Sequence, residues 1–234
     1  CHYKLGALDL IPVFSWLFLR AKCRKCGQPI SAQYPLVELA TAALFVLSLA
    51  FWPLGFEGAS SSLQFAVWLI ACVALVFLFV YDLKWLILPD KVVFILAFLG
   101  VLMAILYGIQ ADSFSAYFQD VVFSLLILSG FYLLLFIYSK GKWIGFGDVK
   151  LGVGLALLLC NWQLAIVALF LANLIGTLVF LPLLALKKVG RSSQIPFGPF
   201  LIVGTIVAFL FGSDIISWYN SILFSGIEVP RYQY

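Results

Sequence analysis

Two aspartates, Asp82 and Asp148, are the residues of this 234-residue chain best placed to carry out chemistry. Each stands at one end of an apolar run, where a charge is costly and needs a reason. Asp82 falls at the end of an expected helix, where a negative charge opposes the helix dipole. Asp148 follows the turn Gly145-Phe146-Gly147. The plain alternatives are a solvated helix end for Asp82 and a helix N-cap for Asp148.

Two carboxylates that meet in a partly dry site cannot both ionise cheaply, so such a pair shares a proton. The pair can hold a water molecule, remove its proton with the ionised member and protonate the leaving amine with the other. This is the chemistry of an aspartic peptidase. Glycines 145 and 147 would allow positive φ and the close approach of a substrate main chain. Asp90, which follows Pro89, has a sufficient role as the N-cap of the next helix.

Other reaction classes fit the residues less well. The single histidine, His2, leaves nothing for a Ser-His-Asp or Cys-His set or for a His-ligated metalloprotease. A proton- or cation-coupled membrane transporter could use Asp82 and Asp148 as its carboxylates. Such transporters are expected to show matched halves with broken helices, and the sequence shows none.

The elements that must bring the two aspartates together are membrane-spanning helices. Apolar residues make up 65% of the chain and charged residues 10%, which is too apolar for one soluble domain. A span needs about 20 apolar residues. Runs of this kind are predicted at 35–54, 63–82, 91–107, 118–138, 163–186 and 196–211. A shorter run, 149–160, could by itself be a span, a re-entrant segment or a buried helix.

Charge placement indicates the topology. If the short run counts as a span, 13 of the 14 Lys and Arg residues fall on one side, and the positive-inside rule makes that side cytoplasmic. If the short run does not cross the membrane, the outer side receives Lys187, Lys188 and Arg191. We therefore predict an all-α, polytopic transmembrane helix bundle with seven spans in this chain. Asp82 and Asp148 would lie at its cytoplasmic end.

The N-terminal segment is polar and basic and holds Cys1, Cys23 and Cys26. The last two form a C-x-x-C turn, and Cys1 precedes it at a spacing close to that of paired zinc knuckles. Zinc is the favoured interpretation, with a redox pair or no metal as alternatives; a cytosolic location disfavours a disulfide. Because the chain opens without Met, we expect a missing N-terminal piece. We divide the chain into an incomplete, zinc-knuckle-like cytosolic segment, 1–33, and a membrane peptidase domain, 34–234.

Five stretches in order resemble the type IV prepilin peptidases, the leader peptidases of type 4 pilins and type II secretion pseudopilins. The stretches lie at 9–26, 34–39, 82–90, 145–151 and 195–200, so the resemblance extends over essentially the whole chain. The resemblance implies an eight-span aspartic endopeptidase of the bacterial cytoplasmic (inner) membrane. It would cut prepilins on the cytoplasmic side, after the glycine that ends a basic leader. A presenilin-like intramembrane protease shares Gly-x-Gly-Asp, but the cysteine segment and residues 195–200 favour the pilin enzyme.

The resemblance implies roles for residues of the membrane domain. Asp82 and Asp148 would be the catalytic pair, and Gly145 and Gly147 would shape the loop that presents Asp148. Glu38 lies near the same interface, and we expect it to help position the substrate by attracting the basic leader. An ordinary carboxylate in an early turn of the helix is the alternative for Glu38.

The resemblance also implies cofactors and partners. Cys1, Cys23 and Cys26 would be three of four zinc-site cysteines in the full-length protein. Many members of the family N-methylate the new N-terminus with S-adenosylmethionine, an activity linked to the cysteine domain; peptide cleavage needs no cofactor. No Rossmann-type glycine fingerprint supports S-adenosylmethionine binding independently. The expected partners are prepilins, pseudopilins and the lipid bilayer, without nucleic acid, and the sequence leaves the oligomeric state open.

Overall fold

The computed structural model describes residues 4–186 and 196–223. Within them the regular structure is helical, and the only β-type pairing is an isolated bridge between Lys22 and Pro29. The described residues form two compact units, one within 1–50 and the other within 51–234. The prediction of an all-α protein is confirmed.

The first unit contains two short helical turns, the cysteine segment and one long helix. These elements are η1 (Ala7–Leu10), α1 (Phe14–Phe18) and α2 (Gln33–Ala50). The apolar run from Leu10 to Leu19 does not form a long helix, because Val13 between η1 and α1 takes a non-helical backbone conformation with φ 61° and ψ −51°. α2 is long and apolar enough to cross a membrane.

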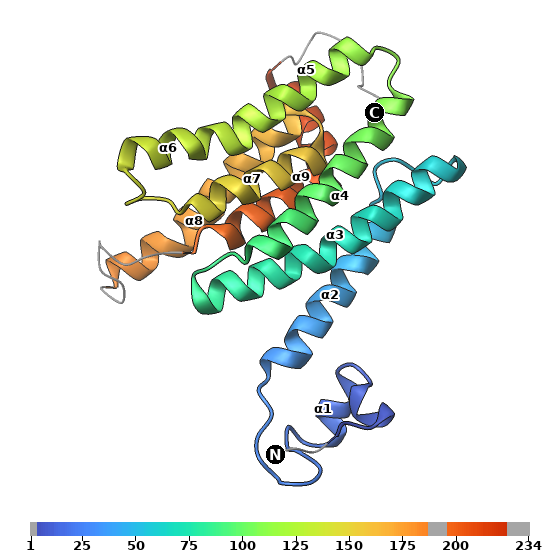
Figure 1. Ribbon diagram of the computed structural model, residues 1–234, viewed down its shortest axis with the longest axis vertical. Coiled ribbons are helices and arrows are strands. Elements are labelled where there is room, and N and C mark those ends of the chain that lie inside the picture. Colours follow the sequence, from blue (N-terminus) through green and yellow to red (C-terminus); the bar gives the residue numbers. More distant parts are fainter. Residues whose placement is uncertain (1–3, 187–195, 224–234) are drawn as a thin grey trace. The chain divides into compact units, whose positions relative to one another are not determined.

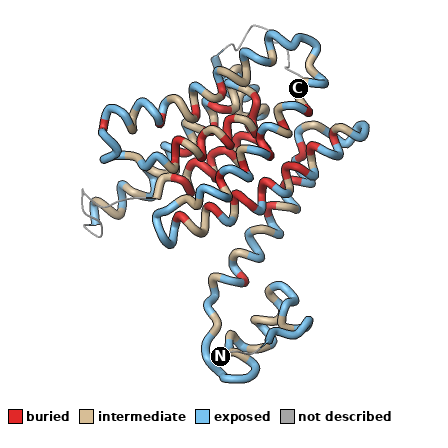
Figure 2. The backbone as a smooth tube through the Cα atoms, viewed as in Figure 1, coloured by how far each residue is buried: buried red, intermediate tan, exposed pale blue. Residues whose placement is uncertain are grey.

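The second unit is a bundle of helices (Figure 1). They are α3 (Gly58–Trp85), α4 (Asp90–Gln110), α5 (Phe114–Leu125), α6 (Phe131–Ser139), α7 (Phe146–Leu159), α8 (Trp162–Ala185) and α9 (Gly198–Leu223). A π-helical turn, η2 (Leu126–Gly130), joins α5 to α6 without a break. Figure 2 shows that buried positions gather in α3, α4, α7 and α9. At the centre of this core the ring of Trp68 stacks on Phe209, with ring centroids 3.8 Å apart.

Six helices among the described residues are long and apolar enough to cross a membrane, so the chain is a membrane protein. They match six of the seven predicted spans. The seventh, the short run 149–160, lies in α7. Its 14 residues span about 21 Å, which is less than a hydrocarbon core of about 30 Å. α7 packs against α4, α5, α6, α9 and η2, and nine of its 14 residues are buried. Neighbouring helices therefore cover it, which allows its ends to lie within the protein.

Glycines let the helices of the bundle approach closely, as is typical of membrane proteins. A Cβ added to Gly152 of α7 would lie 2.8 Å from the carbonyl oxygen of Leu128 in η2. A Cβ on Gly204 of α9 would lie 2.6 Å from the carbonyl oxygen of Ala168 and 2.9 Å from the backbone nitrogen of Ala172, both on α8. These neighbours are backbone atoms, so a side chain at either glycine would force two helices apart.

We therefore expect Gly204→Ala to destabilise the bundle by about 1–3 kcal/mol, the usual cost of overpacking. The thermal unfolding midpoint of the purified protein measures the effect. Gly130→Ala is the matched control, because its Cβ would have no neighbour closer than 3.7 Å. Equal midpoints for the two variants would contradict the proposed close contact of α8 with α9.

Candidate active site

The structure brings Asp82 and Asp148 together at one end of the second unit. Asp82 lies near the end of α3 and Asp148 in the first turn of α7, and both residues are buried, 5% and 8% exposed. A Cβ on Gly198, the first residue of α9, would lie 2.7 Å from Oδ2 of Asp82 and 3.6 Å from Oδ1 of Asp148. The two carboxylate oxygens can be no further apart than the sum of these two distances. This upper limit is comparable to the separation of two oxygens that one water molecule bridges, about 5.5 Å.

The N-terminal ends of α7 and α9 offset the unfavourable position of the Asp82 charge at the C-terminal end of α3. The positive dipole ends of α7 and α9 lie beside the two carboxylates. The backbone of Gly198 lies against the carboxylate of Asp82, and that of Gly145 lies against the carboxylate of Asp148. Asp82 still has an unused acceptor, because its Oδ2 atom is buried without a hydrogen-bond partner among the described residues. The pair can therefore accept a further donor such as water or a peptide group.

The glycine turn before Asp148 differs from its expected backbone conformation. Gly145 is the N-cap of α7 with an extended conformation, φ −76° and ψ 149°, and Gly147 lies within the helix. Neither has positive φ, so that part of the expectation is wrong. A glycine is needed at position 147 because Leu88 approaches it closely. A Cβ on Gly147 would lie 3.3 Å from Cδ1 of Leu88. This contact fixes the loop after α3 against the start of α7.

Asp90 has a different role from the two buried aspartates. It is the first residue of α4, and Pro89 rather than Asp90 takes the N-cap position. The Asp90 carboxylate forms an ion pair with Lys150 of α7. The side chain of Asp90 is 59% exposed and that of Lys150 is 29% exposed, so solvent screens this pair.

Backbone hydrogen bonds close the cysteine turn in the first unit. The N–H of Gly27 donates to the carbonyl of Cys23 at 2.9 Å, and the N–H of Cys23 donates to the carbonyl of Gln28 at 2.8 Å. Gly27 takes φ 67°, which a glycine adopts without strain. The backbone N–H group of Cys26 and, with a smaller effect, that of Lys25 hydrogen-bond to the Cys23 sulfur. These bonds lower the pKa of the Cys23 thiol.

A thiolate held by backbone N–H groups suits a zinc ligand, so Cys23 and Cys26 fit two positions of a zinc site. Cys1 lies outside the described residues. Among the described residues no group of three or more metal-ligating side chains occurs.

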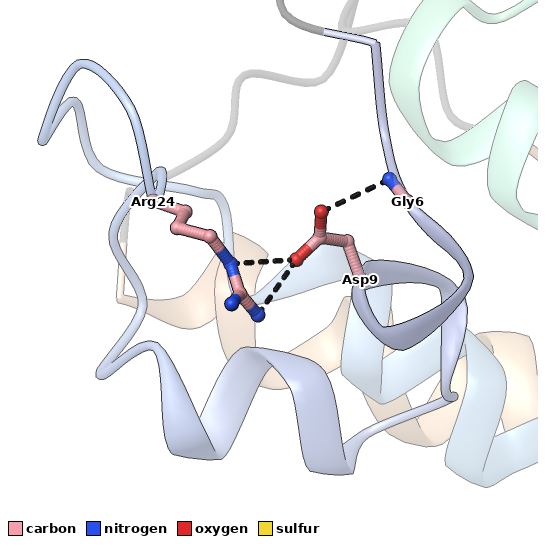
Figure 3. Close-up of polar contacts among 3 residues, drawn as sticks. All are labelled: Gly6, Asp9 and Arg24. Atoms are coloured by element: carbon pink, nitrogen blue, oxygen red, sulfur yellow. Dashed lines mark hydrogen bonds and ion pairs between the residues drawn. The ribbon is translucent and has the colours of Figure 1, made fainter.

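An ion pair stabilises this turn against the preceding segment. Arg24 lies between the two cysteines, and its Nε donates to Oδ1 of Asp9 at 3.0 Å (Figure 3). Oδ2 of Asp9 accepts a bond from the N–H of Gly6 at 3.1 Å. The Asp9 side chain is only 5% exposed, so this charge is paired on both oxygens, as a buried carboxylate requires.

Glu38, on α2, contacts the turn between η1 and α1 in the same unit. Its Oε2 atom accepts a hydrogen bond from the backbone N–H of Val13 at 2.7 Å. Because the positive φ of Val13 is costly for a β-branched residue, Glu38 helps to hold a strained turn. Glu38 itself is exposed.

Two residues at the site were not singled out from the sequence. Gly198 lies in the stretch 195–200. The only sequence feature that marks it there is its position between an aromatic residue and a proline. Tyr132 is one of several hydroxyl-bearing residues inside the apolar run 118–138, and it is 1% exposed. Its electrostatic interaction with Asp148 exists only in the folded chain, so no local pattern predicts it.

Comparison with known proteins identifies the family of the chain. Residues 1–52 match the model of the bacterial peptidase A24 N-terminal domain, and residues 69–181 match that of the type IV leader peptidase family. Proteins named prepilin leader peptidase/N-methyltransferase are similar over most of the chain. The one from Aeromonas hydrophila is 35% identical over 94% of this chain and 72% of its own length. The one from Pseudomonas aeruginosa is 32% identical over the same shares.

A third relative, from Dichelobacter nodosus, is 35% identical over 92% of this chain and 70% of its own length. No solved structure matches the chain significantly. The transporter and presenilin-like alternatives are not favoured by these matches. The chain belongs to the type IV leader peptidase family.

Proposed function

We propose that this protein is a membrane-embedded aspartic endopeptidase that removes the leader from prepilins and pseudopilins, with Asp82 and Asp148 as its catalytic pair. The observation that carries the proposal is the convergence of two buried carboxylates on one residue, Gly198. The names of the relatives supply the substrate class: each is a prepilin leader peptidase/N-methyltransferase.

The geometry supports a mechanism with one proton shared between the two carboxylates. The ionised member takes a proton from a water molecule held between them, and the water oxygen attacks the scissile carbonyl. The protonated member then gives its proton to the leaving amine, so the pair ends with the charge that it started with. Gly198 leaves room for the carboxylates to face each other, and Gly145 and Gly147 shape the loop that presents Asp148.

The substrate chemistry agrees with a cytoplasmic position of the pair. A prepilin has a basic leader in the cytosol followed by an apolar helix in the bilayer, so its scissile bond lies near the inner interface. Lys84, Lys140 and Lys142 lie close in sequence to the same ends of the helices as Asp82 and Asp148. By the positive-inside rule this end faces the cytoplasm. We therefore place the protein in the cytoplasmic (inner) membrane, with its cysteine segment in the cytosol.

Co-expression with a prepilin that has glycine before its apolar helix tests the proposal. We expect a mobility shift of the pilin and a mature N-terminus that begins directly after that glycine, as read by mass spectrometry. An uncut prepilin beside abundant, folded protein would contradict the proposed function.

We propose further that the full-length protein holds zinc at its cysteine segment, with Cys23, Cys26 and Cys1 among the ligands. Zinc would supply a covalent-like cross-link that holds the knuckle closed. The backbone N–H groups aimed at Cys23 support this use of the two described cysteines.

Replacing Cys23 and Cys26 together by serine is expected to remove bound zinc and to lower protein stability or N-methylation before it lowers peptide cleavage. The reason is that these cysteines lie in the first compact unit, whereas both candidate catalytic aspartates lie in the second. Elemental analysis, protein abundance and the mass of the mature pilin measure the three effects. Loss of cleavage at full abundance would be the contrary result.

The second activity, N-methylation, is proposed from the names of the relatives. The first unit contains a cavity of about 850 Å³ lined by residues that include Asp9, Trp16, Tyr34 and Glu38. Aromatic and acidic side chains suit the adenine ring and the positive sulfonium of S-adenosylmethionine. When bound, that cofactor would supply an electrophilic methyl group for the new amino terminus.

Glu38 is proposed to help position the basic leader through its charge. Glu38→Gln retains an acceptor oxygen for the N–H of Val13 and removes only the charge. We expect KM for prepilin to rise about threefold with little change in kcat, because exposed charge pairs contribute about 0.2–1 kcal/mol. The rise should shrink at high salt. Unchanged KM at low salt would contradict this role.

A further inference from the structure

Buried polar atoms without partners are rare and ask for an explanation. Among residues 4–186 and 196–223, three side chains have such atoms: Gln64, Asp82 and Tyr132. Gln64 lies near the start of α3, far along the helix from Asp82. Asp82 and Tyr132 both belong to the surroundings of Asp148. The site therefore contains an unused acceptor and an unused donor.

Tyr132 lies near the start of α9, the helix whose first residue approaches both aspartates. Its ring packs on Phe197, with centroids 5.2 Å apart, and Phe197 directly precedes Gly198. The hydroxyl interacts electrostatically with Asp148, and the side-chain amide of Asn173 lies beside it. Neither group is in hydrogen-bond geometry with the hydroxyl. The O–H group is thus buried within electrostatic range of Asp148, and its hydrogen bond stays unused.

The π-helical turn η2 explains how Tyr132 reaches this position. The Oγ atom of Ser129, in η2, donates to the carbonyl of Val149 at 3.0 Å, and Val149 directly follows Asp148. The backbone of Leu128 packs against Gly152. The extra residue of a π turn changes the face that the following helix presents, and such turns often occur at functional sites. Here η2 is fastened to α7, which fixes the register of Tyr132 relative to Asp148.

Peptide hydrolysis creates a need for a donor at this place. Attack of water on the scissile carbonyl turns its oxygen into an oxyanion, and a donor aimed at that oxygen lowers the barrier. Both aspartates are occupied with the water and the leaving amine. A buried, uncharged O–H group can donate without adding a charge to the apolar site.

We propose that the Tyr132 hydroxyl donates a hydrogen bond to the scissile carbonyl oxygen as it becomes an oxyanion. This inference rests on the proposed peptidase function and adds a third catalytic side chain to the two aspartates. The hydroxyl keeps its proton throughout, and no bond forms to the tyrosine. The proton and the leaving amine are still handled by the carboxylate pair.

The test is Tyr132→Phe in the full membrane protein, assayed with purified prepilin. We expect kcat to fall about 100-fold, as for the loss of one oxyanion donor, with KM and the thermal unfolding midpoint unchanged. Tyr138→Phe is the control, because Tyr138 lies on the same helix and is 79% exposed; its kinetics should equal those of the wild type.

A binding measurement separates the proposed contact from a packing role. A pilin peptide with a tetrahedral hydroxymethylene group in place of the scissile carbonyl should bind Tyr132→Phe at least tenfold more weakly than the wild type. Uncut prepilin should bind equally to Asp148→Asn and to Asp148→Asn with Tyr132→Phe. A wild-type kcat, or a loss of activity that follows a lowered unfolding midpoint, would overturn the inference. An inactive wild-type protein would instead overturn the proposed function itself.

Discussion

Replacing either Asp82 or Asp148 by asparagine is expected to abolish prepilin cleavage, with a loss of about 10⁴-fold or more in kcat. Asparagine has nearly the shape of aspartate but can neither take a proton from water nor pass one to the leaving amine. Because both side chains are buried, no other carboxylate of the described site can replace them. The appearance of mature pilin over time, with purified enzyme, measures the loss.

Asp90→Asn provides the control for this experiment. Asp90 is exposed and pairs with Lys150, so its loss should cost little, in line with the weak contribution of screened ion pairs. We expect it to retain most of the activity. Normal processing by Asp148→Asn, or full inactivation by Asp90→Asn, would mean that the wrong aspartates are assigned.

Gly198→Ala is expected to lower kcat/KM about 100-fold while the protein still folds. The added Cβ would lie 2.7 Å from Oδ2 of Asp82, which is closer than any real carbon contact, so the carboxylate must turn away. The carboxylate is the end of a side chain and can move, which keeps the cost in stability small. A displacement of about 1 Å at a reacting group is enough to cost about 10²-fold in rate.

Gly176→Ala is the matched control for Gly198→Ala. Its Cβ would lie 3.4 Å from the ring of Phe200, an ordinary contact near the start of α9. We expect its kcat/KM and its unfolding midpoint to stay close to those of the wild type. If Gly198→Ala cleaves prepilin normally, then the carboxylates do not need the close approach that this glycine permits.

Much of the fold and the pair of aspartates could be predicted from the sequence. Long apolar runs predict helices of membrane length because hydrocarbon tolerates no unpaired backbone. Six such helices occur among the described residues. The positions of Asp82 and Asp148 indicate a functional role because a charge beside an apolar run is costly. Both arguments use only neighbouring residues, so they can be made before the chain is folded.

The tertiary structure decided the features that depend on distant residues. The run 149–160 could be a span or a buried helix from its sequence, and its packing against α4, α5, α6, α9 and η2 makes α7 a short central helix. Gly198 matters only because its helix begins beside two carboxylates from α3 and α7. Tyr132 matters only because the fold packs it on Phe197 and within electrostatic range of Asp148.

Composition and the positions of charges thus determined that this chain forms membrane helices and which acidic residues stand at their ends. Those properties follow from the local free energy of placing each residue in apolar surroundings. The close packing of helices determined which groups face the aspartate pair. That packing depends on side-chain shape across residues far apart in the chain, and no periodicity along the sequence records it.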